Sequence, residues 1–435
     1  MQLYSTNNPA LRVNFREALF QGLPSDNGLF MPSDLSVLPD SFIRNLSRFS
    51  FQDIAFTVAH TLIGAEIPAS DLRGIVERAI NFPAPVVLLD EHTGILELFH
   101  GPSLAFKDFG ARFMAETMSY FNRGEDQELT ILVATSGDTG GAVAAGFYRT
   151  PGIRVIILYP SGKVSPLQEK QLTTLGHNIT ALEIEGTFDD CQALVKKAFL
   201  DADLNARLRL SSANSINIAR LIPQSFYYFE AFKQVSHLNK PIVFSVPSGN
   251  FGNLTAGLLA SRMGLPVQHF IAATNANDVV PKYLTSGEYR PRPSVRTLSN
   301  AMDVGAPSNF ARMMDLYGST WNTIKNDISG FAFSDVETEK TLRAVDQQYH
   351  YLLDPHGVIG YLALRQYQAT TKKECLGIIL ETAHPAKFRE DMERILHRTI
   401  DIPERLAELQ HRPKVSTILP ADFDTFQSYL LEENT

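Results

Sequence analysis

The sequence lacks the features that mark secreted, membrane-spanning and nucleic-acid-binding proteins. Only two of its 435 residues are cysteines, Cys191 and Cys375, which is too few for a disulfide framework. No apolar run approaches the ~18 residues of a membrane-spanning helix, and no basic stretch precedes an apolar one at the N-terminus. The formal net charge is -8, with no basic run that would bind a nucleic acid or an anionic membrane. These absences predict a cytoplasmic protein whose partner is neither a membrane nor a nucleic acid.

Metal-binding motifs are also missing. The chain has 11 histidines, but no metal-ligand spacing occurs among them, so no metal site is predicted. The composition, 44% hydrophobic and 20% charged, is ordinary for a protein that buries a large core. A length of 435 residues predicts two or three domains of roughly 100–200 residues each.

Short apolar strands alternate with helices over most of the chain after about residue 127. The predicted strands are 129–134, 154–159, 179–184, 241–246, 268–273 and 375–380. One intervening helix is marked by a capping box, because Thr187 lies three residues before Asp190 and apolar residues follow at helical spacing. This alternation is typical of parallel βαβ units and predicts an α/β protein.

Three other segments have a different character. Residues 1–90 are predicted to be mainly helical, and the end of the chain after about residue 400 is predicted to be a mostly helical tail. Residues 291–310 are rich in Pro, Ser and Asn and are predicted to form a long loop.

Lys107 lies in an unusual setting for a lysine. In the segment LFHGPSLAFKDFGARF, residues 98–113, it is flanked by Phe106 and Phe109. Apolar neighbours desolvate an ammonium group and lower its pKa, so that the amine becomes a nucleophile able to form a Schiff base. The alternative is a lysine whose stem lies along an apolar surface while its ammonium group stays in water. The segment alone leaves both interpretations open.

Two glycine-rich turns follow predicted strands and precede predicted helices. They are TSGDTGG at 135–141 and SGNFGN at 248–253. Such a turn presents backbone N–H groups and a helix dipole to an anion, and glycine permits close approach and positive φ. Neither turn matches the P-loop or the dinucleotide fingerprint, so ATP and NAD are poorly supported. Each turn alone could be an ordinary βα connection, but two of them together with the Lys107 segment favour an anion-binding site.

Further polar groups gather in the segment SANSINIAR, residues 212–220. The planar guanidinium of Arg220 suits phosphate or carboxylate recognition, and Lys163 could supply a second cation. The alternatives are a surface ion pair for Arg220 and a solvated loop position for Lys163. His384, which follows the last predicted strand, is either a catalytic residue or a structural histidine.

In this order, these motifs closely resemble the threonine synthase family. The segments LFHGPSLAFKDFGARF, ATSGDTG, SGKVSPLQEK, SANSINIAR, SVPSGNFGNLTAG and ETAHPAKF carry the resemblance. Members of that family are pyridoxal 5'-phosphate enzymes of the tryptophan-synthase-β (fold-type II) group. The resemblance implies a fold-type II α/β enzyme with two parallel-sheet domains around a central cofactor cleft. The implied division is a mainly helical N-terminal domain at 1–90, a small α/β domain at 127–240, and a large cofactor-binding domain at 91–126 and 241–435.

The resemblance also implies roles for individual residues. Lys107 would hold pyridoxal 5'-phosphate covalently, and Thr382 would place its hydroxyl at the pyridine nitrogen. The cofactor phosphate would lie on the turn formed by Gly249, Asn250, Phe251, Gly252 and Asn253. The substrate would be bound by Ser136, Thr139, Lys163, Asn214, Ser215 and Arg220. One residue departs from the pattern of many fold-type II relatives, which have Asn where this chain has Asp138. A carboxylate there needs a proton or a bridging water to reach the cofactor 3-oxygen.

The implied activity is conversion of O-phospho-L-homoserine and water to L-threonine and phosphate. One alternative is another fold-type II lyase, such as a serine/threonine dehydratase, whose substrates bring no phosphate for the Arg220 cluster to bind. The other is a non-catalytic, cofactor-binding paralogue, against which the intact Lys107 and glycine turns argue. The sequence leaves a monomer and a homodimer equally open.

Overall fold

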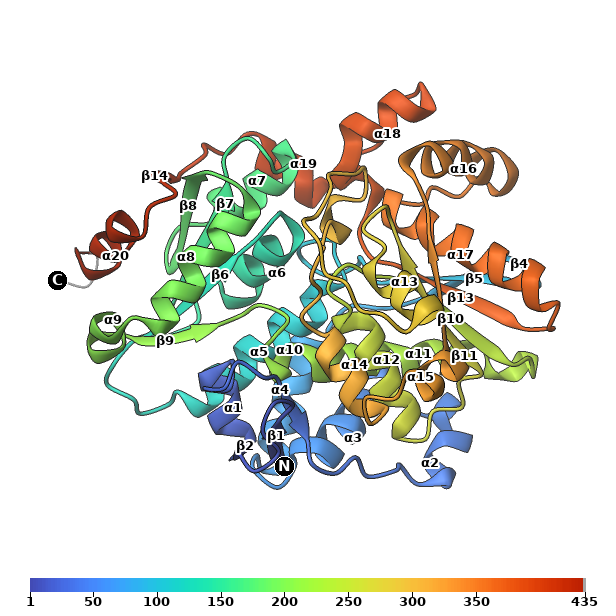
Figure 1. Ribbon diagram of the computed structural model, residues 1–435, viewed down its shortest axis with the longest axis horizontal. Helices are drawn as coiled ribbons and strands as arrows, with labels where there is room; N and C mark the ends of the chain where they lie inside the picture. Colours follow the sequence, from blue (N-terminus) through green and yellow to red (C-terminus); the bar gives the residue numbers. More distant parts are fainter. Residues whose placement is uncertain (433–435) are drawn as a thin grey trace.

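Two mainly parallel sheets, lying side by side, form the framework of the protein (Figure 1). The computed structural model describes residues 1–432. One sheet contains β4 (Val86–Asp90), β5 (Thr93–Glu97), β10 (Ile242–Pro247), β11 (His269–Thr274), β12 (Ile328–Ala332) and β13 (Leu376–Glu381), in the order β12-β11-β10-β13-β5-β4. The other contains β6 (Leu129–Ala134), β7 (Ile153–Pro160), β8 (Ile179–Glu185), β9 (Arg209–Ser212) and β14 (Thr417–Pro420), in the order β14-β8-β7-β6-β9. All neighbouring strands in these two sheets run parallel except β4 and β5. The predicted α/β fold with two parallel sheets is confirmed.

Helices cover both sheets and account for the burial of their central strands. Every residue of β6, β10 and β13 is buried, as expected of parallel strands that are covered on both faces. Helix α17 (Pro355–Thr371) contacts β10, β11 and β13, whereas α8 (Phe188–Leu200) contacts β6 and β7. The other helices are α2 (Asp40–Arg44), α5 (Lys107–Phe121), α6 (Asp138–Phe147), α7 (Pro166–Thr173), α9 (Ala202–Arg207), α10 (Ile218–Leu221), α11 (Phe226–Val235), α12 (Gly252–Arg262), α13 (Val279–Ser286), α14 (Phe310–Leu316), α15 (Trp321–Asp327), α16 (Asp335–Tyr349), α18 (Arg389–Leu396), α19 (Glu404–Gln410) and α20 (Phe423–Glu432), besides those of the N-terminal region.

The predicted capping box at the start of α8 is confirmed. The Thr187 hydroxyl accepts the Asp190 amide at 3.2 Å, and the Asp190 carboxylate accepts the Thr187 amide at 2.7 Å. The apolar face predicted from the spacing, including Leu194 and Ala198, is buried against the five-stranded sheet. Local pattern and tertiary packing therefore agree over this helix.

The N-terminal region contains the expected helices and also a sheet that the sequence did not predict. Besides α2, given above, the helices are α1 (Phe15–Gln21), α3 (Phe51–Ile63) and α4 (Ala69–Ala79). The strands β1 (Gln2–Ser5), β2 (Arg12–Asn14) and β3 (Phe30–Pro32) form a three-stranded antiparallel sheet in the order β2-β1-β3. These strands are three or four residues long, too short to show a periodic pattern.

The ends of the predicted domains need two corrections. The strand β4 pairs with β5 in the six-stranded sheet, so residues 86–90 accompany that sheet and not the N-terminal region. The strand β14 pairs with β8 in the five-stranded sheet, although the sequence assigned the whole of 241–435 to the large domain. By pairing with β8, β14 provides hydrogen-bond partners for backbone groups of β8, which would otherwise be an open edge strand. The predicted loop at 291–310 is confirmed, interrupted only by the 3-10 helix η4 (Asn300–Met302) and ending where α14 begins.

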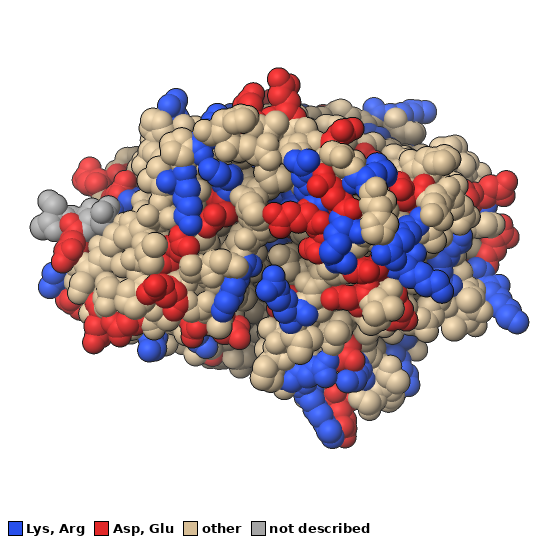
Figure 2. All heavy atoms as spheres, turned by 90° about the horizontal axis from the view of Figure 1, so that it is seen from above, with Lys and Arg blue, Asp and Glu red and all other residues tan. Residues whose placement is uncertain are grey.

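Charged side chains of both signs lie interspersed on the molecular face seen in Figure 2. Across residues 1–432, none of the helices combines the length and apolar character needed to cross a membrane.

A buried arginine ties the N-terminal region to the rest of the protein. Arg312 in α14 is fully buried, and burial lowers the pKa of its guanidinium to about 9. Its Nε donates to the Phe30 carbonyl at 3.1 Å, and its two Nη atoms donate to the carbonyls of Ser215 and Ile216 at 3.1 and 2.7 Å. One side chain thereby connects β3, the loop that follows β9, and α14.

We expect Arg312→Met to lower the free energy of unfolding by about 3 kcal/mol, because each buried carbonyl left without a donor costs about 1–3 kcal/mol. Urea unfolding measures the change. Arg290→Met is the matched control, because the Arg290 side chain is 80% exposed and pairs with Glu288, and a surface pair contributes about 0–1 kcal/mol. Equal stabilities of the two variants would contradict the structural role of Arg312.

Candidate active site

The lysine singled out by the sequence is positioned by a contact between two distant segments. Residues 104–106 lie antiparallel to 382–384, and the Phe106 amide donates to the Thr382 carbonyl at 2.8 Å. Because Lys107 is the first residue of α5, this contact brings it beside the carboxyl end of β13. The two segments thus form one wall of a cleft.

The cleft collects almost every residue that the sequence predicted. It has a volume of about 280 Å³ and lies where loops leave the carboxyl ends of β6, β9, β10 and β13, the edge at which open parallel sheets bind ligands. The predicted residues on its walls are Lys107, Ser136, Thr139, Asn214, Ser215, Arg220, Gly249, Asn250, Phe251, Gly252, Asn253 and Thr382.

The Lys107 amine lies in a desolvating environment in this cleft. The side chain keeps some exposed surface toward the cleft, but protein surrounds its amine. Desolvation lowers the pKa of Lys107 to about 8, helped by the positive charges of Arg220 and Lys387 and opposed by Asp138. The Phe106 ring centroid lies 5.9 Å from Nζ. The sequence-based expectation of a desolvated lysine agrees with this environment.

A second lysine explains how Asp138 stays in the cleft as a carboxylate. Lys387 is buried, and its ammonium group lies 2.6 Å from Asp138 Oδ1 and donates to the Ser103 carbonyl at 2.9 Å. The Gln168 amide donates to the same Asp138 oxygen at 2.8 Å. Burial opposes ionisation, but the charges of Lys387 and Lys107 outweigh it and hold the pKa of Asp138 well below its usual range. An ammonium group therefore stands beside Asp138. The proton or bridging water expected between Asp138 and the cofactor 3-oxygen stays a prediction.

The first glycine turn opens α6 as predicted. The Thr135 hydroxyl accepts the amides of Gly137 and Gly140 at 3.0 and 2.8 Å. Gly137 has φ 142°, and a Cβ there would lie 2.6 Å from the Gln168 side chain. Both constraints require glycine at this position.

The second turn opens α12, but its conformation differs from the expectation. The positive φ belongs to Phe251, at 60°, and neither Gly249 nor Gly252 has one. Gly249 is required for space, because a Cβ there would lie 2.7 Å from the Met302 Cα. The Asn253 side chain fixes the turn by donating to the Pro247 carbonyl at 2.8 Å. The asparagine side chains thus shape the turn and leave its backbone N–H groups to a ligand.

Arg220 is a buried cation of the cleft with one unsatisfied nitrogen. It is 2% exposed, its Nη1 donates to the Ala213 carbonyl at 2.5 Å, and its Nε has no hydrogen-bond partner in the described part of the chain. Burial lowers the pKa of its guanidinium to about 10. Nearby, the Ser215 hydroxyl accepts the Asn250 amide at 2.6 Å and so links the polar cluster to the second turn. The surface ion pair considered for Arg220 is therefore wrong.

The structure does not bring two of the considered residues into the cleft. Lys163 lies in an exposed loop, where its amine donates to the Gly186 carbonyl at 2.9 Å. His384 caps the 3-10 helix η5 (Pro385–Phe388) by accepting the Ala386 amide at 3.1 Å, and burial lowers its pKa to about 4. The geometry of His384 is that of a structural histidine.

Other residues of the cleft were missed by the sequence. They include Gln224, Asp303 and His356, all on its walls. His356 follows Asp354 by two residues at the start of α17, a weak signal that could have drawn attention to it.

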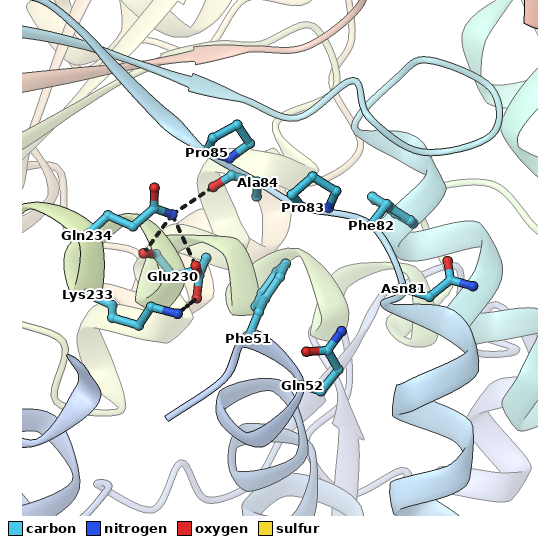
Figure 3. A pocket seen from close by; sticks show the side chains of 10 residues that line it. All are labelled: Phe51, Gln52, Asn81, Phe82, Pro83, Ala84, Pro85, Glu230, Lys233 and Gln234. Atoms are coloured by element: carbon cyan, nitrogen blue, oxygen red, sulfur yellow. Dashed lines mark hydrogen bonds and ion pairs between the residues drawn. The ribbon is translucent and has the colours of Figure 1, made fainter. Parts of the chain in front are cut away.

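A second hollow, of about 390 Å³, lies outside the cleft between α3 and α11 (Figure 3). Its two charged side chains form an ion pair, in which the Lys233 ammonium lies 2.8 Å from the Glu230 carboxylate. The Gln234 amide donates to the Ala84 carbonyl at 2.8 Å. Lys107 and both glycine turns line the other cavity, so the chemistry belongs to the cleft.

Comparison with known proteins agrees with this geometry. Residues 91–380 match the family described as pyridoxal-phosphate dependent enzyme, residues 2–80 match the threonine synthase N terminus, and residues 358–430 match the threonine synthase C-terminal family. A curated threonine synthase of Escherichia coli (strain K12) is 46% identical over 432 residues, which cover 99% of each chain.

Solved structures give the same answer. The crystal structure of threonine synthase from Escherichia coli superposes with a TM-score of 0.93 at 46% identity and covers 100% of both chains. The structure of pyridoxal-phosphate-bound threonine synthase from Brucella melitensis superposes with a TM-score of 0.92 at 35% identity and covers 99% of both chains. From these matches over nearly its whole length, the chain belongs to the threonine synthase family of pyridoxal-phosphate-dependent enzymes.

Proposed function

We propose that this chain converts O-phospho-L-homoserine and water to L-threonine and phosphate. The carrying observation is that one cleft holds both the Lys107 amine, with its lowered pKa, and the buried guanidinium of Arg220, which forms no ion pair with residues 1–432 and whose Nε has no hydrogen-bond partner there. The first is a group that bonds a carbonyl cofactor, and the second is a group that binds a phosphate. Membership of the family supports the same substrate.

The residues of the cleft fit the family's cofactor, pyridoxal 5'-phosphate. The Lys107 amine forms no ion pair within 4 Å with any carboxylate of residues 1–432. The second turn offers the N-terminus of α12 to the cofactor phosphate, at a glycine that leaves room for close approach. Thr382 lies on the wall beside Lys107 and would hold the pyridine nitrogen through its hydroxyl.

The cofactor supplies an electron sink for negative charge that develops on the substrate carbons. Lys107 would hold the cofactor through Nζ, and its released amine would take the proton from substrate Cα and relay a proton from Cβ. A pKa of about 8 leaves part of this amine unprotonated near neutral pH, as a base requires. Ser136 and Thr139, at the start of α6, orient the substrate carboxylate.

The phosphate of the substrate distinguishes this proposal from its rivals. Arg220, Asn214 and Ser215 form a polar wall in which Arg220 Nε is buried without a partner in the described chain. A buried unpaired guanidinium is costly unless an anion binds it. The substrate of a dehydratase-like lyase carries no phosphate, so such an enzyme would have no anion to offset the cost of the buried guanidinium. A non-catalytic paralogue does not need the lowered pKa of Lys107. Cys191 and Cys375 are free thiols, which supports the predicted cytoplasmic location.

Lys107→Ala is expected to abolish covalent attachment of the cofactor and to lower threonine formation by at least about 100-fold, the smaller end of a general base's contribution. Borohydride reduction of the wild type followed by peptide mass spectrometry should label Lys107. The other buried lysine of the cleft region, Lys387, is ion-paired with Asp138 and should stay unlabelled. Label on Lys387 would disprove the assignment.

Gly252→Val should weaken retention of the cofactor while the protein still folds. A Cβ at this position would have its nearest neighbour, the Asn309 side-chain nitrogen, at 3.5 Å, which is ordinary contact. The added methyl groups would instead occupy the space in which the cofactor phosphate approaches the backbone. Cofactor absorbance after dialysis measures retention, and thermal unfolding of the cofactor-free protein is the control. Full retention in a folded variant would reject this turn as the phosphate site.

Arg220→Ala should keep the cofactor absorbance but lower kcat/KM for O-phospho-L-homoserine about ten- to a hundredfold, as expected for a lost charge-assisted contact. Phosphate should inhibit the wild type more strongly than the variant. Side activity on serine should be nearly unchanged. Lys163→Ala is the comparison, and we expect a smaller effect because its amine bonds Gly186 outside the cleft. If turnover of serine fell equally in Arg220→Ala, the cluster would be structural.

A further inference from the structure

The start of α17 holds a histidine that the proposed mechanism does not use. His356 is 2% exposed and lies on the wall of the cleft. Asp354, the N-cap of α17, lies with its Oδ1 2.5 Å from His356 Nδ1 and also accepts the His356 amide at 2.5 Å. The amides of Gly357 and Ala383 donate to the same carboxylate at 3.4 and 3.1 Å. The imidazole is therefore held in one orientation by a carboxylate that is itself fixed by two elements.

The hydrogen bonds decide which nitrogen of His356 carries the proton. An aspartate carboxylate only accepts, so Nδ1–H donates to Asp354. The neighbouring Glu381 does not compete as a second charge, because burial and the Asp354 carboxylate raise its pKa well above the usual range. Because Nδ1 is engaged with Asp354, Nε2 on the opposite edge of the ring is the nitrogen left for another partner.

Nε2 of His356 is buried and has no hydrogen-bond partner among residues 1–432. A buried polar atom of this kind is normally satisfied by a ligand or a water. The surroundings disfavour an anionic occupant, since the carboxylates of Asp138, from α6, and Asp303, from the loop after α13, line the same cleft as His356. A third carboxylate, Asp354, lies behind the ring. A phosphate beside three carboxylates would be repelled, whereas a water molecule would not.

We propose that His356 is the catalytic base that activates the water added to the substrate, with Asp354 as its positioning residue. This proposal rests on the proposed function and adds a second base to it. As the water oxygen bonds to Cβ, one O–H bond breaks and its proton goes to Nε2. The electron pair of the carbon–carbon double bond at Cβ moves to Cα. Nε2 returns the proton to solvent before the next turnover.

Neither buried lysine is available for this step. Lys107 transfers the protons at Cα and Cβ in the proposed mechanism. Lys387 is held in its ion pair with Asp138 at 2.6 Å. His384 points elsewhere, because its Nδ1 caps η5 and it does not line the cleft. His356 is left as the group with an unengaged basic atom on the wall of the cleft.

The test compares phosphate release with threonine formation. Wild type should give the two products in equal amounts. In His356→Gln, phosphate leaves before water adds, so a first turnover should release phosphate at nearly the wild-type rate while threonine formation falls about 100-fold. The carbon skeleton that does not gain water at Cβ should escape and hydrolyse to 2-oxobutanoate and ammonia. This route also consumes one water, and both products can be measured.

Controls separate a base from a structural residue. His384→Gln makes the same chemical change in a histidine outside the cleft and should keep the products equal. His356→Ala removes the ring, and added imidazole should restore threonine relative to 2-oxobutanoate. The cofactor absorbance should be unchanged in both His356 variants.

Three results would overturn the proposal. Phosphate and threonine falling in equal proportion in His356→Gln would show that His356 does not act on water. Failure of imidazole to restore threonine in a folded His356→Ala, or loss of the cofactor from both variants, would make the dyad structural. If wild type itself released no phosphate from O-phospho-L-homoserine, the proposed function would fail instead, which is a different outcome.

Discussion

Two lysines lie near one ionised carboxylate, Asp138, and the chemistry of the cleft depends on which of them forms the ion pair with it. Lys387 takes it, at 2.6 Å from Asp138, and Lys107 is left without a carboxylate partner. Desolvation, together with the positive charges of Arg220 and Lys387, lowers the pKa of Lys107 to about 8. The negative charge of Asp138 opposes this shift only in part. If Asp138 paired with Lys107 instead, the ammonium form would be stabilised and the amine would be a poorer nucleophile.

This arrangement exists only because distant segments meet. The backbone of 104–106 pairs with 382–384, which carries Lys107 to the end of β13. Asn250 bonds Ser215 and so connects the loops that follow strands of the two different sheets. Arg312 donates hydrogen bonds to the backbone carbonyl groups of Ser215 and Ile216. These hydrogen bonds hold the polar walls of the cleft together without a ligand, and such preorganisation reduces the entropy lost on binding.

Much of the framework was predictable because its signals are local. The buried strands of both sheets appear as apolar runs, and the capping box at Thr187 marks the start of α8. Other features have no local signal. The four-residue strand β14 is defined by its pairing with β8, and the positive φ of Phe251 is imposed by the turn around it. The exposed position of Lys163 likewise follows from the loop that carries it.

The sequence by itself determined the residue types of the site: an amine among aromatic neighbours, two glycine turns at helix starts, and a guanidinium beside hydroxyl and amide groups. The sequence could do so because each of these groups belongs to a motif of a few adjacent residues. Only the tertiary structure decided which lysine stays without an ion pair, which nitrogen of His356 is bonded to Asp354, and that Arg220 is buried without an ion pair. These properties depend on desolvation and on charges contributed by remote segments, and both arise only when the chain has folded.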